Sequence, residues 1–174
     1  RKWHIGVAFD SDRITVYLPG TEYASLAIEN ETGDITIPGG FRFADMNLSV
    51  STGDISSEAE AGDVRIASST GRICVENAAV GSLNLTTSTG KVTVKNLTCA
   101  GDLKVGVSVG KIDLTDVTCK NMVSRGSTGD VSLCNVVASE TLSVVRSTGD
   151  ITFRDCDAFE VYARASTGNI EGNF

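Results

Sequence analysis

The stretch Ser147–Ile151, which reads Ser-Thr-Gly-Asp-Ile, belongs to a motif that recurs along most of the chain. The glycine of this motif, or of a close variant, returns every 18 to 20 residues, at Gly33, Gly53, Gly71, Gly90, Gly110, Gly129, Gly149 and Gly168. A fixed interval of this length is typical of a solenoid, in which each repeat forms one rung that stacks on the rung before it. Because glycine adopts positive φ at little cost, the recurrent glycine predicts a corner in every rung.

Apolar residues flank each of these glycines at fixed distances. Two residues after it stand Ile35, Ile55, Ile73, Val92, Ile112, Val131, Ile151 and Ile170. Seven residues before it stand Leu26, Met46, Val64, Leu83, Leu103, Met122, Leu142 and Val161. The alternation around both rows has the period of a β-strand. The pattern therefore predicts two short strands per rung, with a second turn near Ala61–Asp63, Gly81–Ser82, Gly101–Asp102 or Ser139–Glu140.

Stacking lets such short strands bury their apolar side chains. Equivalent strands are expected to pair in parallel about 4.8 Å apart, and so short a rung has no room for a connecting helix. With the usual crossover handedness, the sequence predicts an all-β fold, a right-handed single-stranded parallel β-helix of about eight rungs over residues 26–174. Residues 1–25 do not fit the repeat; Trp3–Phe9 and Arg13–Leu18 are expected to form two strands that cap the solenoid.

The composition excludes several classes of protein. The 174 residues are 41% hydrophobic and 21% charged, with a formal net charge of −7, which disfavours nucleic acid as a partner. No apolar run approaches the ~20 residues that span a bilayer. The five cysteines show no Cys-x-x-Cys spacing, so the sequence predicts no disulfide framework, metal site or cofactor. Cys99 and Cys119, each nine residues after a corner glycine, are expected to be stacked, buried thiols.

Seven charged side chains and one neutral amide follow the corner glycines directly, in the row Asp34, Asp54, Arg72, Lys91, Lys111, Asp130, Asp150 and Asn169. Stacked like charges about 5 Å apart repel by roughly 1 kcal/mol in water, so a bound ion or ligand could be favoured there. The candidate binding residues are Arg72, Lys91, Lys111, Asp130 and Asp150. The alternative is a solvated row of turn residues.

Asp130 and Asp150 also raise the question of catalysis, because carboxylates on adjacent rungs would have the ~5 Å separation of a retaining glycosidase. Such an enzyme also needs a carboxyl with a raised pKa inside a cleft. Aromatic residues are few, and no long insertion interrupts the rungs to wall a cleft. The sequence therefore predicts no catalytic residue.

The repeated Ser-Thr-Gly-Asp-Ile/Val unit, at Ser51–Ile55, Ser127–Val131 and Ser147–Ile151, resembles that of a bacterial family described as adhesins, a β-strand-repeat domain of unknown function. The resemblance covers roughly residues 26–170 and departs from the motif at Glu31–Gly33 and Ser108–Gly110. It implies a right-handed single-stranded β-helix, held outside the cytoplasmic membrane by a separate anchor. It brings no catalytic residues to carry over.

These observations favour a non-enzymatic interaction module of the bacterial cell surface or envelope. The expected partner is a cell-wall glycan, the host matrix or another envelope protein. A structural or sensory spacer in a membrane-anchored envelope protein is the alternative, and a polysaccharide-cleaving enzyme is a further one. At the C-terminal rung three alternatives are open: Phe174 folds over the rung, the chain continues, or two copies associate end to end.

Overall fold

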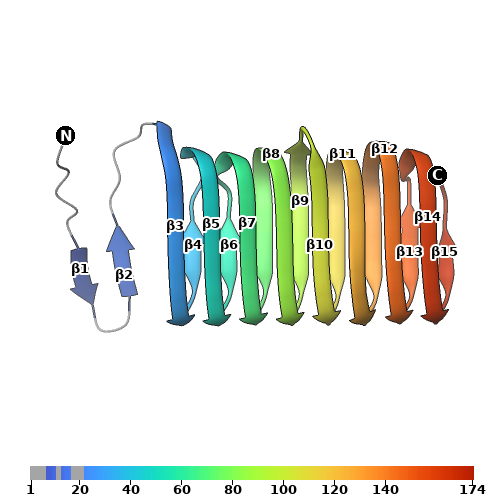
Figure 1. The fold of residues 1–174 in the computed structure, drawn as a ribbon, viewed down its shortest axis with the longest axis horizontal. Coiled ribbons are helices and arrows are strands. Elements are labelled where there is room, and N and C mark those ends of the chain that lie inside the picture. The colour runs from blue at the N-terminus through green and yellow to red at the C-terminus, as the bar shows by residue number, and fades with distance from the viewer. Residues whose placement is uncertain (1–6, 11–12, 17–21) are drawn as a thin grey trace.

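The computed structural model describes residues 7–10, 13–16 and 22–174. These residues form fifteen β-strands joined by turns (Figure 1). The strands are β1 (Val7–Asp10), β2 (Arg13–Val16), β3 (Glu22–Thr32), β4 (Ile35–Ile37), β5 (Arg42–Thr52), β6 (Ile55–Ser57), β7 (Glu60–Thr70), β8 (Ile73–Thr89), β9 (Val92–Cys99), β10 (Asp102–Val109), β11 (Ile112–Thr128), β12 (Val131–Thr148), β13 (Ile151–Arg154), β14 (Asp157–Thr167) and β15 (Ile170–Gly172). A helix long and apolar enough to cross a membrane is absent from the described residues.

The strands that precede the repeat form a hairpin. β1 pairs with β2 in antiparallel fashion, with Val7 opposite Val16 and Asp10 opposite Arg13. Two strands were expected here, and both exist over these shorter ranges. The other residues of the expected strands, 3–6 and 17–18, lie outside the described residues. The role of this hairpin as a cap stays a prediction.

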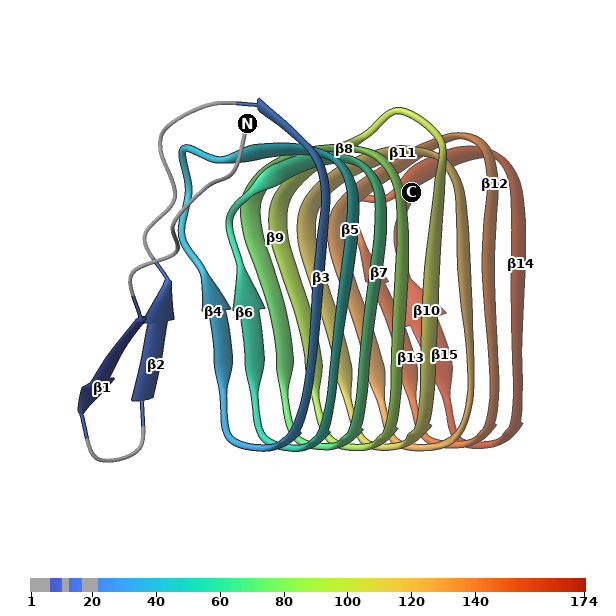
Figure 2. The ribbon, with the colours of Figure 1, turned by 60° about the vertical axis from the view of Figure 1, so that its left-hand side comes forward.

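The strands β3 to β15 form a single sheet of 13 strands, and every pairing within it is parallel. Each strand pairs with the equivalent strand of the next rung, so the rungs follow one another along the long axis in Figure 1. In Figure 2 they appear as stacked loops, each offset from the one before. The predicted parallel β-solenoid of about eight rungs is confirmed.

Most members of the two predicted apolar rows point into the solenoid, whereas Val161 and Ile170 in the last rung are 40% and 45% exposed. In the row after the corner glycine, Ile55, Ile73, Val92 and Ile112 are fully buried. In the row before it, Leu83, Leu103, Met122 and Leu142 are at most 1% exposed. The register pairs each member with its equivalent on the next rung, so like side chains stack into continuous ladders. These ladders form the one hydrophobic core of the solenoid.

The corners from Gly53 to Gly168 require glycine for two reasons, and Gly129 illustrates both. Its φ is 124°, in the region that side-chain-bearing residues rarely adopt, and the other seven corner glycines also have positive φ. A Cβ placed on Gly129 would also lie 1.9 Å from the carbonyl oxygen of Gly110, its equivalent on the preceding rung. The predicted corner is confirmed, and the close stacking of backbones adds a constraint that the spacing alone did not reveal.

The second turn differs from the prediction, because at three of the four predicted positions it does not separate two strands. Gly62 lies within β7, Gly81–Ser82 within β8 and Ser139–Glu140 within β12; these last two strands are 17 and 18 residues long. Among the predicted positions, a break occurs only at Ala100–Gly101, between β9 and β10, while other rungs break at residues 38–41, 58–59 and 155–156. The pairing of β7 with β8 keeps its register through the bend, whereas the register of β11 against β12 shifts between Cys119 and Asn121 although both strands continue.

A further bend lies six residues after the corner glycine and was not predicted. Non-glycine residues with φ between 49° and 55° occupy it on five successive rungs: Asn77, Asn96, Asp116, Asn135 and Asp155. Asn and Asp tolerate this conformation better than other side-chain-bearing residues. The Asn96 amide donates to Asn77 Oδ1 at 2.9 Å, and the Asn135 amide donates to Asp116 Oδ1 at 2.6 Å. The polar ladder therefore links neighbouring rungs at this bend.

Candidate functional site

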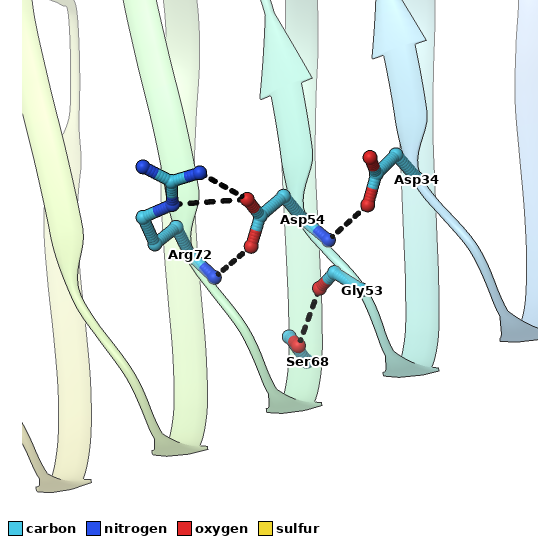
Figure 3. A network of polar contacts seen from close by, with 5 residues as sticks. All are labelled: Asp34, Gly53, Asp54, Ser68 and Arg72. Atoms are coloured by element: carbon cyan, nitrogen blue, oxygen red, sulfur yellow. Dashed lines mark hydrogen bonds and ion pairs between the residues drawn. The ribbon is translucent and has the colours of Figure 1, made fainter.

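The charged row beside the corner glycines is held together by contacts between rungs, as Figure 3 shows for its first three members. Asp54 donates its backbone N–H to Asp34 Oδ1 at 2.8 Å. The Asp54 carboxylate in turn accepts the backbone N–H of Arg72 at 2.7 Å, and Arg72 Nε and Nη2 at 2.9 and 2.7 Å. These bonds lower the pKa of the Asp54 carboxyl, with the backbone donor as the largest cause. The corner carboxylate thus ties one rung to the next.

The remaining candidate residues of this row also find partners within the chain. Lys91 forms an ion pair with Asp113. Lys111 Nζ lies 2.9 Å from Asp130 Oδ2, and Asp130 Oδ1 accepts the backbone N–H of Asp150 at 3.2 Å. The repulsion expected between stacked like charges is therefore relieved by pairing with carboxylates of neighbouring rungs. The structure brings these residues together as a structural row, and their role in binding a ligand stays a prediction.

Asp130 has the electrostatic environment of a stable carboxylate. The ammonium of Lys111 is the largest cause that lowers the pKa of Asp130, and the backbone N–H of Asp150 is the second. A glycosidase general acid needs the opposite shift, a raised pKa that keeps its proton near neutral pH. The geometry of the row favours structural ion pairs.

Three of the five cysteines are buried inside the stack, and two of them share one offset from a corner glycine. Cys99 and Cys119 are free thiols with 4% and 7% exposure, as expected from their common offset. Burial raises the pKa of Cys119 to about 12 and also raises that of Cys99, so both are protonated at neutral pH. The described residues contain no group of three or more His, Cys, Asp or Glu side chains that could hold a metal ion.

A groove lies on the outward side of β3, β5, β7, β8 and β10 and encloses about 740 Å³. Two parallel rows of outward side chains line it. The row eight residues before the corner glycines contains Ser25, Asp45, Asp63, Ser82 and Asp102, and the row six residues before them contains Ala27, Asn47, Arg65, Asn84 and Lys104. With a rung spacing of about 4.8 Å, the five rungs extend about 19 Å along the axis. None of the lining residues is aromatic.

The groove carries hydrogen-bonding groups that have no partner among the described residues. Asp45, Asn47, Arg65 and Asn84 make no side-chain hydrogen bond or ion pair with any residue that the structure describes. Other lining groups are partly engaged: Asp63 Oδ1, for example, accepts the hydroxyl of Ser82 at 2.6 Å. The free groups include acceptors, donors and amides that do both. The groove can therefore bind a polar ligand through hydrogen bonds from several successive rungs.

Sequence reasoning missed this groove, although its signal was present. The lining residues occupy the outward positions on either side of the buried row of Met46, Val64 and Leu83. Once that row is assigned to the core, strand alternation places its neighbours on the surface. The concavity of that surface could not be read from alternation, because it depends on how the stacked strands bend.

The comparisons with known proteins identify the family. The model of the Toastrack DUF4097 family, a domain of unknown function, matches residues 1–174. The chain belongs to this family. No curated protein and no solved structure matches this Toastrack chain. The match shows a domain of unknown function, while the adhesin description suggested by the repeat motif is a proposal.

Proposed function

We propose that this Toastrack domain is a non-enzymatic interaction module that binds an extended glycan along the groove of β3, β5, β7, β8 and β10. The observation that carries the proposal is the set of unpaired polar side chains on successive rungs, represented by Asn47, Arg65 and Asn84. Glycan hydroxyls both donate and accept hydrogen bonds, which suits amide and charged side chains of this kind. A polymer of repeated sugar units would meet a repeated set of partners.

The proposed location is the cell surface or envelope of a bacterium, outside the cytoplasmic membrane. The support is the resemblance of the Ser-Thr-Gly-Asp-Ile repeats to a bacterial family described as adhesins. A cell-wall glycan and a glycan of the host matrix would present the same chemistry to the groove. Adhesion is then the retention of such a glycan by many individually modest hydrogen bonds.

Catalysis is not part of this proposal. The pKa of Asp130 is lowered by Lys111, whereas cleavage of a glycosidic bond needs a carboxyl with a raised pKa. Arg72 and Lys91 are likewise paired with carboxylates of other rungs. Such pairs stabilise the stack, and a carboxylate held in an ion pair is a poor general acid for protonating a leaving group.

Titration calorimetry with soluble oligosaccharides of increasing length tests the glycan proposal. We expect the affinity to rise with length until the oligosaccharide spans the groove. Arg65→Ala should weaken binding about tenfold, because a hydrogen bond to a charged group contributes about 1.5 kcal/mol. Arg125→Ala is the matched control: Arg125 is an exposed arginine of β11 outside the groove, and its side chain pairs with no described residue.

The panel should contain neutral, amino and acidic glycans. Equal binding by the Arg65 and Arg125 variants would place the ligand elsewhere on the solenoid. Failure of the wild-type protein to bind any member would contradict the glycan proposal and favour the alternative, a structural or sensory spacer.

A further inference from the structure

Arg146 is a charged residue in the interior of the solenoid. It lies on β12, and only 1% of its surface is exposed. Among the fully buried side chains of the described residues, it has the largest volume. Its Nη2 donates to the hydroxyl of Ser124 at 3.1 Å. Its Nε and Nη1 are buried without a hydrogen-bond partner. A buried donor without a partner in a native interior calls for an explanation, such as an ordered water or a bound ion.

The charge of Arg146 has no counterion within the described residues. No ion pair involves it, and desolvation by burial is the sole cause acting on its pKa, which it lowers. A guanidinium nevertheless remains protonated, because its ordinary pKa lies far above neutral pH. Water could accept the free N–H groups, but it would leave the positive charge uncompensated in an apolar interior.

The preceding rung is shaped around the Arg146 head group. Ser124 and Gly126 occupy the inward positions that Val105 and Val107 hold one rung earlier. A Cβ added to Gly126 would lie 2.0 Å from Arg146 Nη1. The guanidinium therefore lies beside small residues, at positions where the rung before theirs carries the larger side chains of Val105 and Val107.

The following rung is also small beside Arg146. Its register partner is Ala165, and the partner of the adjacent inward residue Val144 is Ala163. Both alanines are partly buried and pack against the core. The Arg146 head group therefore lies between rungs with small side chains on both sides. Its described neighbours supply methyl groups, a hydroxyl and backbone, and none supplies a carboxylate.

We propose that the interior of the solenoid binds a small inorganic anion, of the size of chloride, against the Arg146 guanidinium. The anion accepts a free N–H of Arg146 and neutralises its charge. The Ser124 hydroxyl, which accepts from Nη2, can turn its own proton toward the same ion. The site is independent of the glycan groove, which lies on the outer surface of earlier rungs.

Thermal unfolding in chloride, with gluconate replacing chloride at constant ionic strength, tests this site. We expect the wild-type midpoint to rise by about 4 °C for each tenfold increase of chloride above its dissociation constant, because the ion binds only the folded state. Arg146→Met, which keeps the length and removes the charge, should show no such rise. Arg125→Met, an exposed arginine of the preceding rung, should respond like the wild type.

Crystals of the wild-type protein grown in bromide give a readout that needs no variant. We expect an anomalous peak within hydrogen-bond distance of Arg146 Nε or Nη1. The proposal is overturned if the wild type and Arg146→Met respond equally to chloride, or if bromide peaks occur only on the surface.

Discussion

At the scale of single residues, a corner glycine meets two demands that no other residue satisfies. Gly129 needs positive φ, and its α-carbon faces the carbonyl oxygen of Gly110 too closely for a side chain. Gly106 provides the contrast, because its φ is ordinary and a Cβ there would meet no atom closer than 3.9 Å. The same residue type is therefore indispensable at one position and replaceable at the other.

Gly129→Ala should lower the free energy of unfolding by about 3 kcal/mol or more, since backbone strain adds to a clash with a neighbouring backbone. Gly106→Ala should change it by less than about 1 kcal/mol. Urea denaturation of both variants measures the difference. Similar values for the two would refute the account of the corner as a site of close backbone stacking.

At the scale of elements, the corner row links successive rungs through carboxylates that accept backbone N–H groups. Asp54 is bonded in this way to Arg72, and the pKa of its carboxyl is lower in the folded chain than in the unfolded chain. Such a group contributes stability above its unfolded pKa of about 3.9. That contribution is lost as the pH falls through the folded pKa.

Asp54→Asn should flatten the acid limb of the stability profile below about pH 4, because the amide cannot form the ion pair with Arg72. The effect should stay below about 1 kcal/mol, since the pair is largely exposed to solvent. Urea denaturation across this pH range measures it. Asp45→Asn, at an exposed residue with no described partner, is the control and should follow the wild-type profile; a flattened limb there as well would argue against the assignment.

At the scale of the whole molecule, the solenoid is a linear array. β11 pairs only with β9, β10 and β12, which belong to the two neighbouring rungs, so each rung is stabilised locally. In such an array, stability is close to a sum of terms for rungs and for the interfaces between them. A defect in one rung should therefore weaken its neighbours most.

Leu114→Ala creates a cavity in the core of β11, where Leu114 is fully buried, and should cost about 3 kcal/mol. Hydrogen exchange followed by mass spectrometry should show the largest loss of protection in β9, β11 and β12, and a smaller loss in β3 and β5. Thr115→Ala, at the adjacent outward position, is the control. Uniform loss across all rungs would show that the solenoid unfolds as one cooperative unit.

The sequence predicted most of the fold because its decisive features repeat. Ile73 and Leu83 are buried as their rows required, and the hairpin before the repeat exists. The second turn was placed correctly near Gly101 and wrongly treated as a break near Gly81, because continuous pairing between rungs depends on register and not on composition. The candidate charged row was located, but its pairing across rungs was not foreseen.

The sequence by itself determined the corner glycines, the inward rows and the parallel stack, because positive φ and in-out alternation are properties of one rung that the chain repeats. Only the tertiary structure decided which charges pair, which outward residues border a groove and how Arg146 lies in the core. These features join residues of different rungs. They depend on the lateral register of the stack and on the volumes of neighbouring side chains, such as Ser124 and Gly126 beneath Arg146.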